Sequence, residues 1–189
     1  AGTVTIRMFP NQFNLVCFTL QESIEMKVAK FGDTSLASAE QIKKICAIIT
    51  EDPQRRLVVV SAPGKRSADD TKVTDLLIEA ARVRLTGQDG TGEIERVIDR
   101  YRDIAQALNL PDDSLALIRE DFLHRLHLNT RDEGLYVDTM KAGGEDNSAR
   151  LVASYLRSMG IEAHYADPGE SGMILSDEPG NARVLKQSY

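Results

Sequence analysis

Residues 57–64 of this 189-residue chain read LVVVSAPG. An unbroken run of leucine and β-branched side chains is typical of a strand that is buried on both faces of a parallel sheet. Pro63-Gly64 then ends the strand, because proline donates no ladder hydrogen bond and glycine permits a tight turn. The run therefore predicts an α/β protein built on a mostly parallel sheet.

The segments on either side of this strand alternate between strand and helix patterns. Residues 28–31 predict a short strand, and Ser38-x-x-Gln41 is a capping box that opens a helix to about Thr50. Downstream we expect helices over 76–85, 93–108, 113–128 and 145–159, the last capped by Gly160, and two short strands at 161–165 and 173–176. This order predicts a mostly parallel sheet flanked by helices, with a helical elaboration at about 75–130.

Composition and charge exclude several classes of protein. The chain has 42% hydrophobic and 28% charged residues, and its 23 basic and 29 acidic residues give a net charge of −6 without a basic block. We therefore expect neither nonspecific nucleic-acid binding nor docking on an anionic membrane. The two cysteines, Cys17 and Cys46, have no metal-binding spacing and imply no disulfide framework, so a cytoplasmic protein is expected.

Residues 1–25 differ from the rest of the chain. Pro10 and neighbouring polar residues interrupt their apolar clusters, so the stretch matches neither a transmembrane helix nor a signal peptide. From Met26 the sequence MKVAKFG looks like a natural start, followed at once by a strand and a glycine turn. We expect residues 1–25 to be an extension that is not part of the fold.

The first candidate site is residues 30–35, with the sequence KFGDTS. A lysine at the end of a strand, a glycine turn and two hydroxyl side chains are suited to a phosphate group, because backbone N–H groups and a cation then face the anion. The sequence is neither a Walker loop nor a Rossmann fingerprint, and an ordinary strand-to-helix turn is the alternative interpretation.

Two further candidates follow the buried strand and a later glycine pair. Ser61 and Thr74 offer hydroxyl groups where ligands of open α/β sheets bind, although Thr74 also suits the cap of a helix. Glu145 follows Gly143-Gly144 at the expected start of a helix, where a carboxylate is favourable by itself. Residues 65–72, which lie between Ser61 and Thr74, are polar, and we expect them to be mobile.

Other polar clusters suggest no site. The three histidines, His124, His127 and His164, lack the spacing of metal ligands, and we predict no protein-bound metal. One helix carries a set of alternating charges that is typical of a solvated face: Arg96, Asp99, Arg100, Arg102 and Asp103.

Together these motifs resemble the amino-terminal part of an aspartokinase, a member of the amino-acid kinase family. The resemblance covers residues 26–189 in the family's order. It rests on KFGDTS against the family's KFGGTS, on VVVSA at 58–62, VTDLL at 73–77, GEDNSA at 144–149 and PGNARVL at 179–185. It implies an αβα sandwich, of which residues 26–189 would be the aspartate-binding part.

The resemblance also implies an activity and its residues. ATP with Mg²⁺ would phosphorylate the β-carboxylate of L-aspartate to 4-phospho-L-aspartate, the first step of lysine, threonine and methionine biosynthesis, and the full-length enzyme would be a homo-oligomer. Lys30 would be catalytic by stabilising phosphoryl charge, and Ser61, Thr74 and Glu145 would hold aspartate. The resemblance also implies that the phosphate turn consists of Lys30, Phe31, Gly32, Asp33, Thr34 and Ser35.

Two departures from the family point against activity in this chain. Asp33 replaces a family glycine and puts a negative charge where phosphates would lie. Repulsion between two unit charges about 4 Å apart costs about 1 kcal/mol in water and about 4 kcal/mol at an effective dielectric of 20. A required φ above zero would add roughly 1 kcal/mol. The family's later GRGGSD segment and nucleotide half have no counterpart. We therefore expect the chain alone to lack kinase activity, and the alternative function is a truncated, noncatalytic module for amino-acid binding or oligomerisation.

Overall fold

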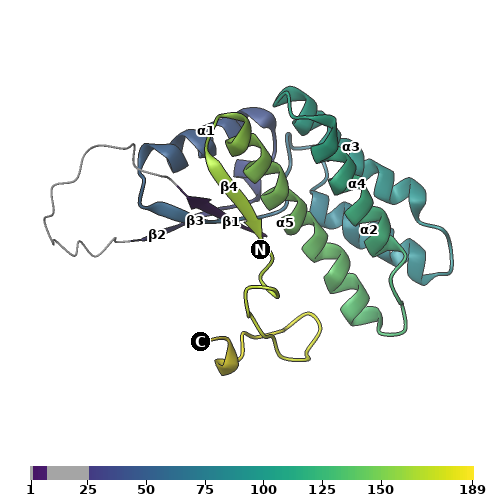
Figure 1. The fold of residues 1–189 in the computed structure, drawn as a ribbon. Helices are drawn as coiled ribbons and strands as arrows, with labels where there is room; N and C mark the ends of the chain where they lie inside the picture. The colour runs from purple at the N-terminus through teal and green to yellow at the C-terminus, as the bar shows by residue number, and fades with distance from the viewer. Residues whose placement is uncertain (1, 8–25) are drawn as a thin grey trace, which may run out of the picture.

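The computed structural model describes residues 2–7 and 26–189, and Figure 1 shows their arrangement. The first half of the chain forms β1 (Gly2–Arg7), β2 (Lys27–Phe31), the 3-10 helix η1 (Asp33–Leu36), α1 (Ala39–Glu51), β3 (Arg55–Val60) and α2 (Val73–Leu85). The second half forms α3 (Thr91–Ala107), α4 (Asp112–Leu126), α5 (Glu133–Ser158), β4 (Glu162–Ala166) and the 3-10 helix η2 (Lys186–Ser188). No helix in these described ranges has the length and apolar character needed to cross a membrane.

The four described strands form one sheet in the order β2-β3-β1-β4. β2 and β3 are parallel, with Val28 beside Leu57 and Phe31 beside Val60. β1 is antiparallel to both β3 and β4, so β2, β3 and β4 all run in one direction. The predicted α/β class with a mostly parallel sheet and flanking helices is confirmed.

The antiparallel strand comes from the stretch that we expected to stand outside the fold. Residues 2–7 pair with β3 from Gly2 opposite Val60 to Thr5 opposite Leu57, and with β4 from Thr3 opposite Ala166 to Arg7 opposite Glu162. For residues 2–7 the expectation therefore differs from the structure, because a central position in a sheet satisfies their backbone groups on both sides. The rest of the expected extension, residues 1 and 8–25, lies outside the described part.

The core lies between the sheet and one layer of helices. Val58 and Val60 are fully buried on the side where α1 and α5 contact the sheet and each other. Leu57 and Val59 point to the opposite face and are half-buried, whereas Val28 is 63% exposed. In Figure 1 the carboxyl-terminal segment runs below this second face, and Leu57, Met173 and Val184 line a cavity there. One face of the predicted buried strand is thus covered by helices and the other is only partly covered.

Two predictions about the ends of helices are confirmed, and two predictions about element boundaries are wrong. Ser38 caps α1, since its hydroxyl accepts from the Gln41 N–H at 3.4 Å, and Gly160 ends α5 with φ of +81°. The expected strand at 173–176 is an isolated bridge between Leu175 and Val184. The helix expected from residue 145 begins at Glu133, twelve residues earlier.

Candidate functional site

The loops that follow β2 and β3 meet at one edge of the sheet. The Ser61 N–H donates to the Phe31 carbonyl at 3.2 Å, and the Gly64 N–H donates to the Asp33 carbonyl at 2.8 Å. A Cβ on Gly64 would lie 2.8 Å from the Asp33 carbonyl carbon, so only glycine permits this approach. The structure therefore brings the predicted phosphate turn and Ser61 together.

The phosphate turn consists of the end of β2, Gly32 and η1. Gly32 has φ of −80°, and a Cβ there would meet nothing within 4 Å. The described non-glycine residue with positive φ is Asn109, so Asp33 carries none of the conformational cost that a left-handed position would impose. The remaining consequence of Asp33 is electrostatic.

The carboxylate of Asp33 is engaged by the protein itself. One oxygen accepts from the Thr34 N–H at 2.8 Å, and the other lies 2.6 Å from the Lys72 ammonium. The hydrogen bond from Lys72 is the main reason that the pKa of Asp33 lies below its ordinary value. The negative charge in the turn is therefore neutralised by a lysine from the loop after β3.

Lys30 lies on the face of the sheet that the helices leave open. It pairs in register with Val59, on the opposite side from the buried Val58 and Val60, and its side chain is exposed. Among the described residues no ion pair reaches Lys30. Its charge is thus available to a ligand at this edge, in contrast to that of Lys72.

Gly144 brings α5 to the end of β3. A Cβ at this position would lie 2.8 Å from Ala62 Cβ and 3.0 Å from Leu77 Cδ1, which is closer than side chains tolerate. Glu145 follows directly and is half-buried. Gly143 and Gly144, which we expected to precede a helix, are helix-packing residues, and Glu145 lies in the middle of a 26-residue helix. A helix amino terminus therefore does not explain the carboxylate.

Tyr101 fixes this part of α5. Its hydroxyl donates to the Gly144 carbonyl at 2.5 Å and lies 3.3 Å from Ser148 Oγ. Its ring packs against Phe122 with centroids 5.3 Å apart, and burial raises the pKa of its hydroxyl. A buried tyrosine of α3 thus holds the backbone beside Glu145, a contact that the sequence pattern did not indicate.

Thr74 is the second residue of α2 and is half-buried. The cap of this helix is Lys72, and the Val73 N–H donates to the Pro63 carbonyl at 3.1 Å. The alternative interpretation of Thr74 as the cap is therefore wrong. Because α2 begins against the loop after β3, Thr74 shares the edge of the sheet with Ser61.

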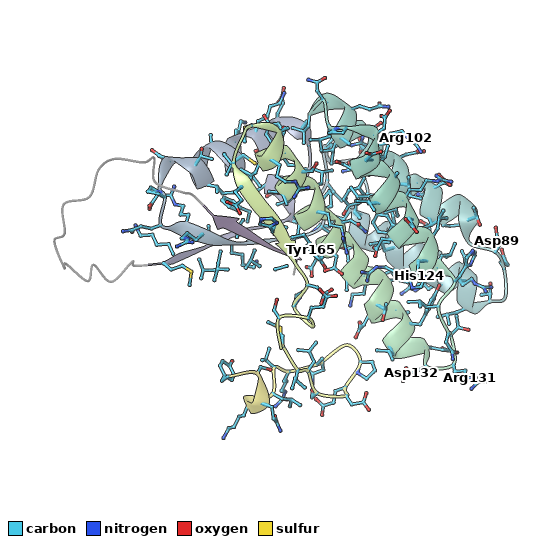
Figure 2. The ribbon with its side chains drawn as sticks, viewed as in Figure 1. Asp89, Arg102, His124, Arg131, Asp132 and Tyr165 are labelled. Carbon is cyan, nitrogen blue, oxygen red and sulfur yellow. The ribbon has the colours of Figure 1, made fainter. Side chains whose placement is uncertain are left out.

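Arg100 was expected on a solvated face, but it is only 4% exposed. Its guanidinium donates to the Gly64 carbonyl at 2.8 Å and to Asp70 Oδ2 at 2.5 Å. Arg66 pairs with the same carboxylate at 3.0 Å, whereas Arg102, labelled in Figure 2, lies at the outer side of α3. Residues 64–72 are therefore tied to α3, contrary to the expectation that residues 65–72 are mobile. Recognising this from sequence would have required knowing that the loop packs on α3.

No group of three histidine, cysteine or acidic side chains gathers to hold a metal ion within residues 2–7 and 26–189. His124, labelled in Figure 2, lies in the last turn of α4. Cys46 is buried in the core, and burial raises the pKa of its thiol to about 12. Neither His124 nor Cys46 takes part in the arrangement around Ser61 and Glu145.

A sequence model described as the amino acid kinase family matches residues 25–188. Aspartokinase 3 of Bacillus subtilis (strain 168) is 46% identical over 164 residues, and the match covers 87% of this chain and 36% of that protein. The aspartokinase of Chlamydia trachomatis serovar D is 32% identical over 139 residues, covering 72% of this chain and 29% of the relative. The chain thus spans about a third of the length of these relatives.

Solved structures show the same fold. Escherichia coli aspartokinase III in complex with aspartate and ADP superposes with a TM-score of 0.68 at 22% identity, over 87% of this chain and 36% of that one. Clostridium acetobutylicum aspartate kinase gives a TM-score of 0.58 at 29% identity, over 69% of this chain and 29% of that one. The resemblance stated from the motifs is therefore confirmed.

Proposed function

The chain belongs to the amino acid kinase family, and from this premise we propose that it forms the aspartate-binding part of an aspartate kinase. The observation that carries the proposal is the contact of Gly144 with Ala62 and Leu77, which sets Glu145 beside the ends of β3 and α2. A half-buried carboxylate where the parallel strands β2 and β3 end is suited to a ligand's cation.

The chemistry of the edge suits an amino acid with two carboxylates. Glu145 would pair with the ammonium group of L-aspartate, and the hydroxyls of Ser61 and Thr74 would donate to its carboxylates. Lys30, exposed and free of ion pairs among the described residues, would stabilise charge on the phosphoryl group. The complex of E. coli aspartokinase III with aspartate and ADP supports this ligand class.

Phosphoryl transfer places modest demands on such a site. It needs positioned groups and neutralised charge rather than a covalent nucleophile, and ATP would deliver the γ-phosphoryl group to the β-carboxylate of aspartate. Mg²⁺ would bind mainly through the substrate phosphates, with few protein ligands. The phosphate turn at residues 30–35 would face these phosphates, and Mg²⁺ would neutralise their charge.

Because the matched relatives are about three times as long, we propose kinase turnover for a longer protein and aspartate binding for residues 1–189. A cytoplasmic location and a homo-oligomer for that longer protein belong to the same proposal. Purified 1–189 should bind L-aspartate without converting it in a coupled assay that contains ATP and Mg²⁺. Turnover by this chain would contradict the proposal that residues 1–189 only bind aspartate.

Calorimetric titration with L-aspartate tests the binding site. Glu145→Gln keeps the size of the side chain but removes the charge that would meet the ammonium group, and we expect at least tenfold weaker binding. Glu120→Gln is the matched control, because Glu120 is exposed on α4. Equal affinity of the wild type and Glu145→Gln would overturn the proposal. Loss of binding in both variants would point to a general effect of charge.

A further inference from the structure

We infer that Lys72 is a phosphate-binding cation of this site and that Asp33 competes for it as an internal anion. The inference rests on the proposed function, since it assumes that the turn at residues 30–35 receives phosphate. It assigns a binding role to a lysine that no sequence motif indicated, and it gives Asp33 a role beyond simple repulsion.

The geometry places both charges at the mouth of the turn. Asp33 Oδ2 lies 2.6 Å from the Lys72 ammonium, and Oδ1 accepts from the Thr34 N–H at 2.8 Å. An ammonium and a backbone N–H are the two kinds of donor that a phosphate oxygen uses. The Asp33 carboxylate thus occupies the donors that a phosphate group would otherwise engage.

The position of Lys72 is fixed by its backbone. It is the cap residue of α2, its neighbour Val73 donates to Pro63, and the Gly64 N–H donates to the Asp33 carbonyl. The loop after β3 therefore holds the backbone of Lys72 close to η1 even when the side chains separate. A ligand that displaced the Asp33 carboxylate would find the ammonium already in place.

The ion pair contributes little to stability and is therefore easy to exchange. The Lys72 and Asp33 side chains are 46% and 37% exposed, and exposed pairs of this kind are worth roughly 0–1 kcal/mol. A polyphosphate carries several negative charges and outcompetes a single carboxylate for one ammonium. The pair is thus better suited to exchange with a ligand than to support of the fold.

A double-mutant cycle separates this role from simple repulsion by Asp33. Inorganic tripolyphosphate is titrated at low salt into the wild type, Asp33→Asn, Lys72→Met and the double variant, all as residues 1–189. Removing one unit charge near the ligand should tighten binding about 5- to 100-fold in Asp33→Asn. In the Asp33→Asn background, Lys72→Met should then weaken binding at least fivefold, because the cation released from Asp33 is lost to the ligand. A lysine that only neutralised Asp33 would have no effect in this background.

The pair of Lys27 and Asp52 serves as the control. It lies at the other end of β2, with a distance of 2.9 Å and exposures of 48% and 21%. Asp52→Asn should leave tripolyphosphate binding unchanged. Equal binding by Asp33→Asn and the double variant, no gain from Asp33→Asn, or no binding by any variant would overturn the inference. Titration of the same variants with L-aspartate is independent, so failure of the aspartate site and failure of Lys72 give different results.

Discussion

At the scale of single residues, close backbone approach decides the geometry of the site. Gly64 and Gly144 are buried, and a Cβ at either position would lie only 2.8 Å from a neighbouring atom. A Cβ at Gly32 or Gly92 would meet nothing within 4 Å. The first two therefore set distances between elements, and Gly92 only lowers helix propensity. Glycines with the same appearance in the sequence thus carry different physical roles.

Gly144→Ala should damage both packing and aspartate binding. The new methyl group would lie 2.8 Å from Ala62 Cβ, so α5 or β3 must shift, at a cost of typically 1–3 kcal/mol in unfolding free energy. Urea denaturation measures the stability. Calorimetry measures the affinity for L-aspartate, which should fall if Glu145 is displaced. Gly92→Ala is the matched control, where a Cβ in α3 meets nothing within 4 Å and should stabilise by roughly 0.5–1 kcal/mol. Equal stability and affinity for Gly144→Ala would contradict the packing argument.

At the scale of elements, the loop at residues 64–72 is held by a buried arginine. Arg100→Met removes the donors to the Gly64 carbonyl and Asp70, and breaking a buried pair of this kind costs about 3–5 kcal/mol. We expect a lower midpoint in urea and faster proteolysis within the loop. Arg96→Met is the control, since its pair with Glu79 is about half exposed. A loop that stays resistant to protease in Arg100→Met would show that other contacts hold it.

The same loop should make the protein sensitive to acid. Hydrogen bonds from Arg66, and then from Arg100, hold the pKa of Asp70 well below its ordinary value of 3.8. A depressed pKa means that this stabilisation is present above about pH 4 and is lost as the pH falls towards the folded-state pKa. Asp70→Asn should therefore be less stable than the wild type at pH 7, and the difference should narrow below pH 4. A constant difference from pH 7 to pH 2.5 would contradict the assignment.

Elements were predictable where the signal lies within a few residues. Ser38 and Gly160 marked the ends of their helices, and Val58 and Val60 marked the buried strand. The first half of α5 was missed because Gly143-Gly144 was interpreted as a loop, although Tyr136, Met140, Asn147 and Leu151 lie at helical spacing. The burial of Arg100 and the ion pair of Asp33 with Lys72 depend on which loops meet, and that information is not local.

At the scale of the whole molecule, the two faces of the sheet are unequal. Helices bury Val58 and Val60, while the opposite face carries Val28 at 63% exposure beside the catalytic candidate Lys30. The continuous apolar run at residues 57–60 matches a strand covered on both faces, and the relatives that the chain matches are about three times as long. The composition of the strand thus agrees with the proposal that the sheet belongs to a longer protein.

The position of β1 gives the sharpest test of the whole sheet. Thr5 lies opposite Leu57 of β3 and His164 of β4, so proline there would remove a backbone donor from the middle of the sheet. Thr5→Pro should therefore lower the free energy of unfolding, measured in urea, by about 1–3 kcal/mol, the cost of leaving a buried hydrogen-bonding group without a partner. Deleting residues 1–25 should destabilise the chain as well, because the facing edges of β3 and β4 would lose their pairing. If both variants unfold at the wild-type midpoint, residues 1–25 are an extension outside the fold, as their sequence alone suggested. If both unfold earlier, β1 is an integral strand that joins β4 to the parallel pair of β2 and β3.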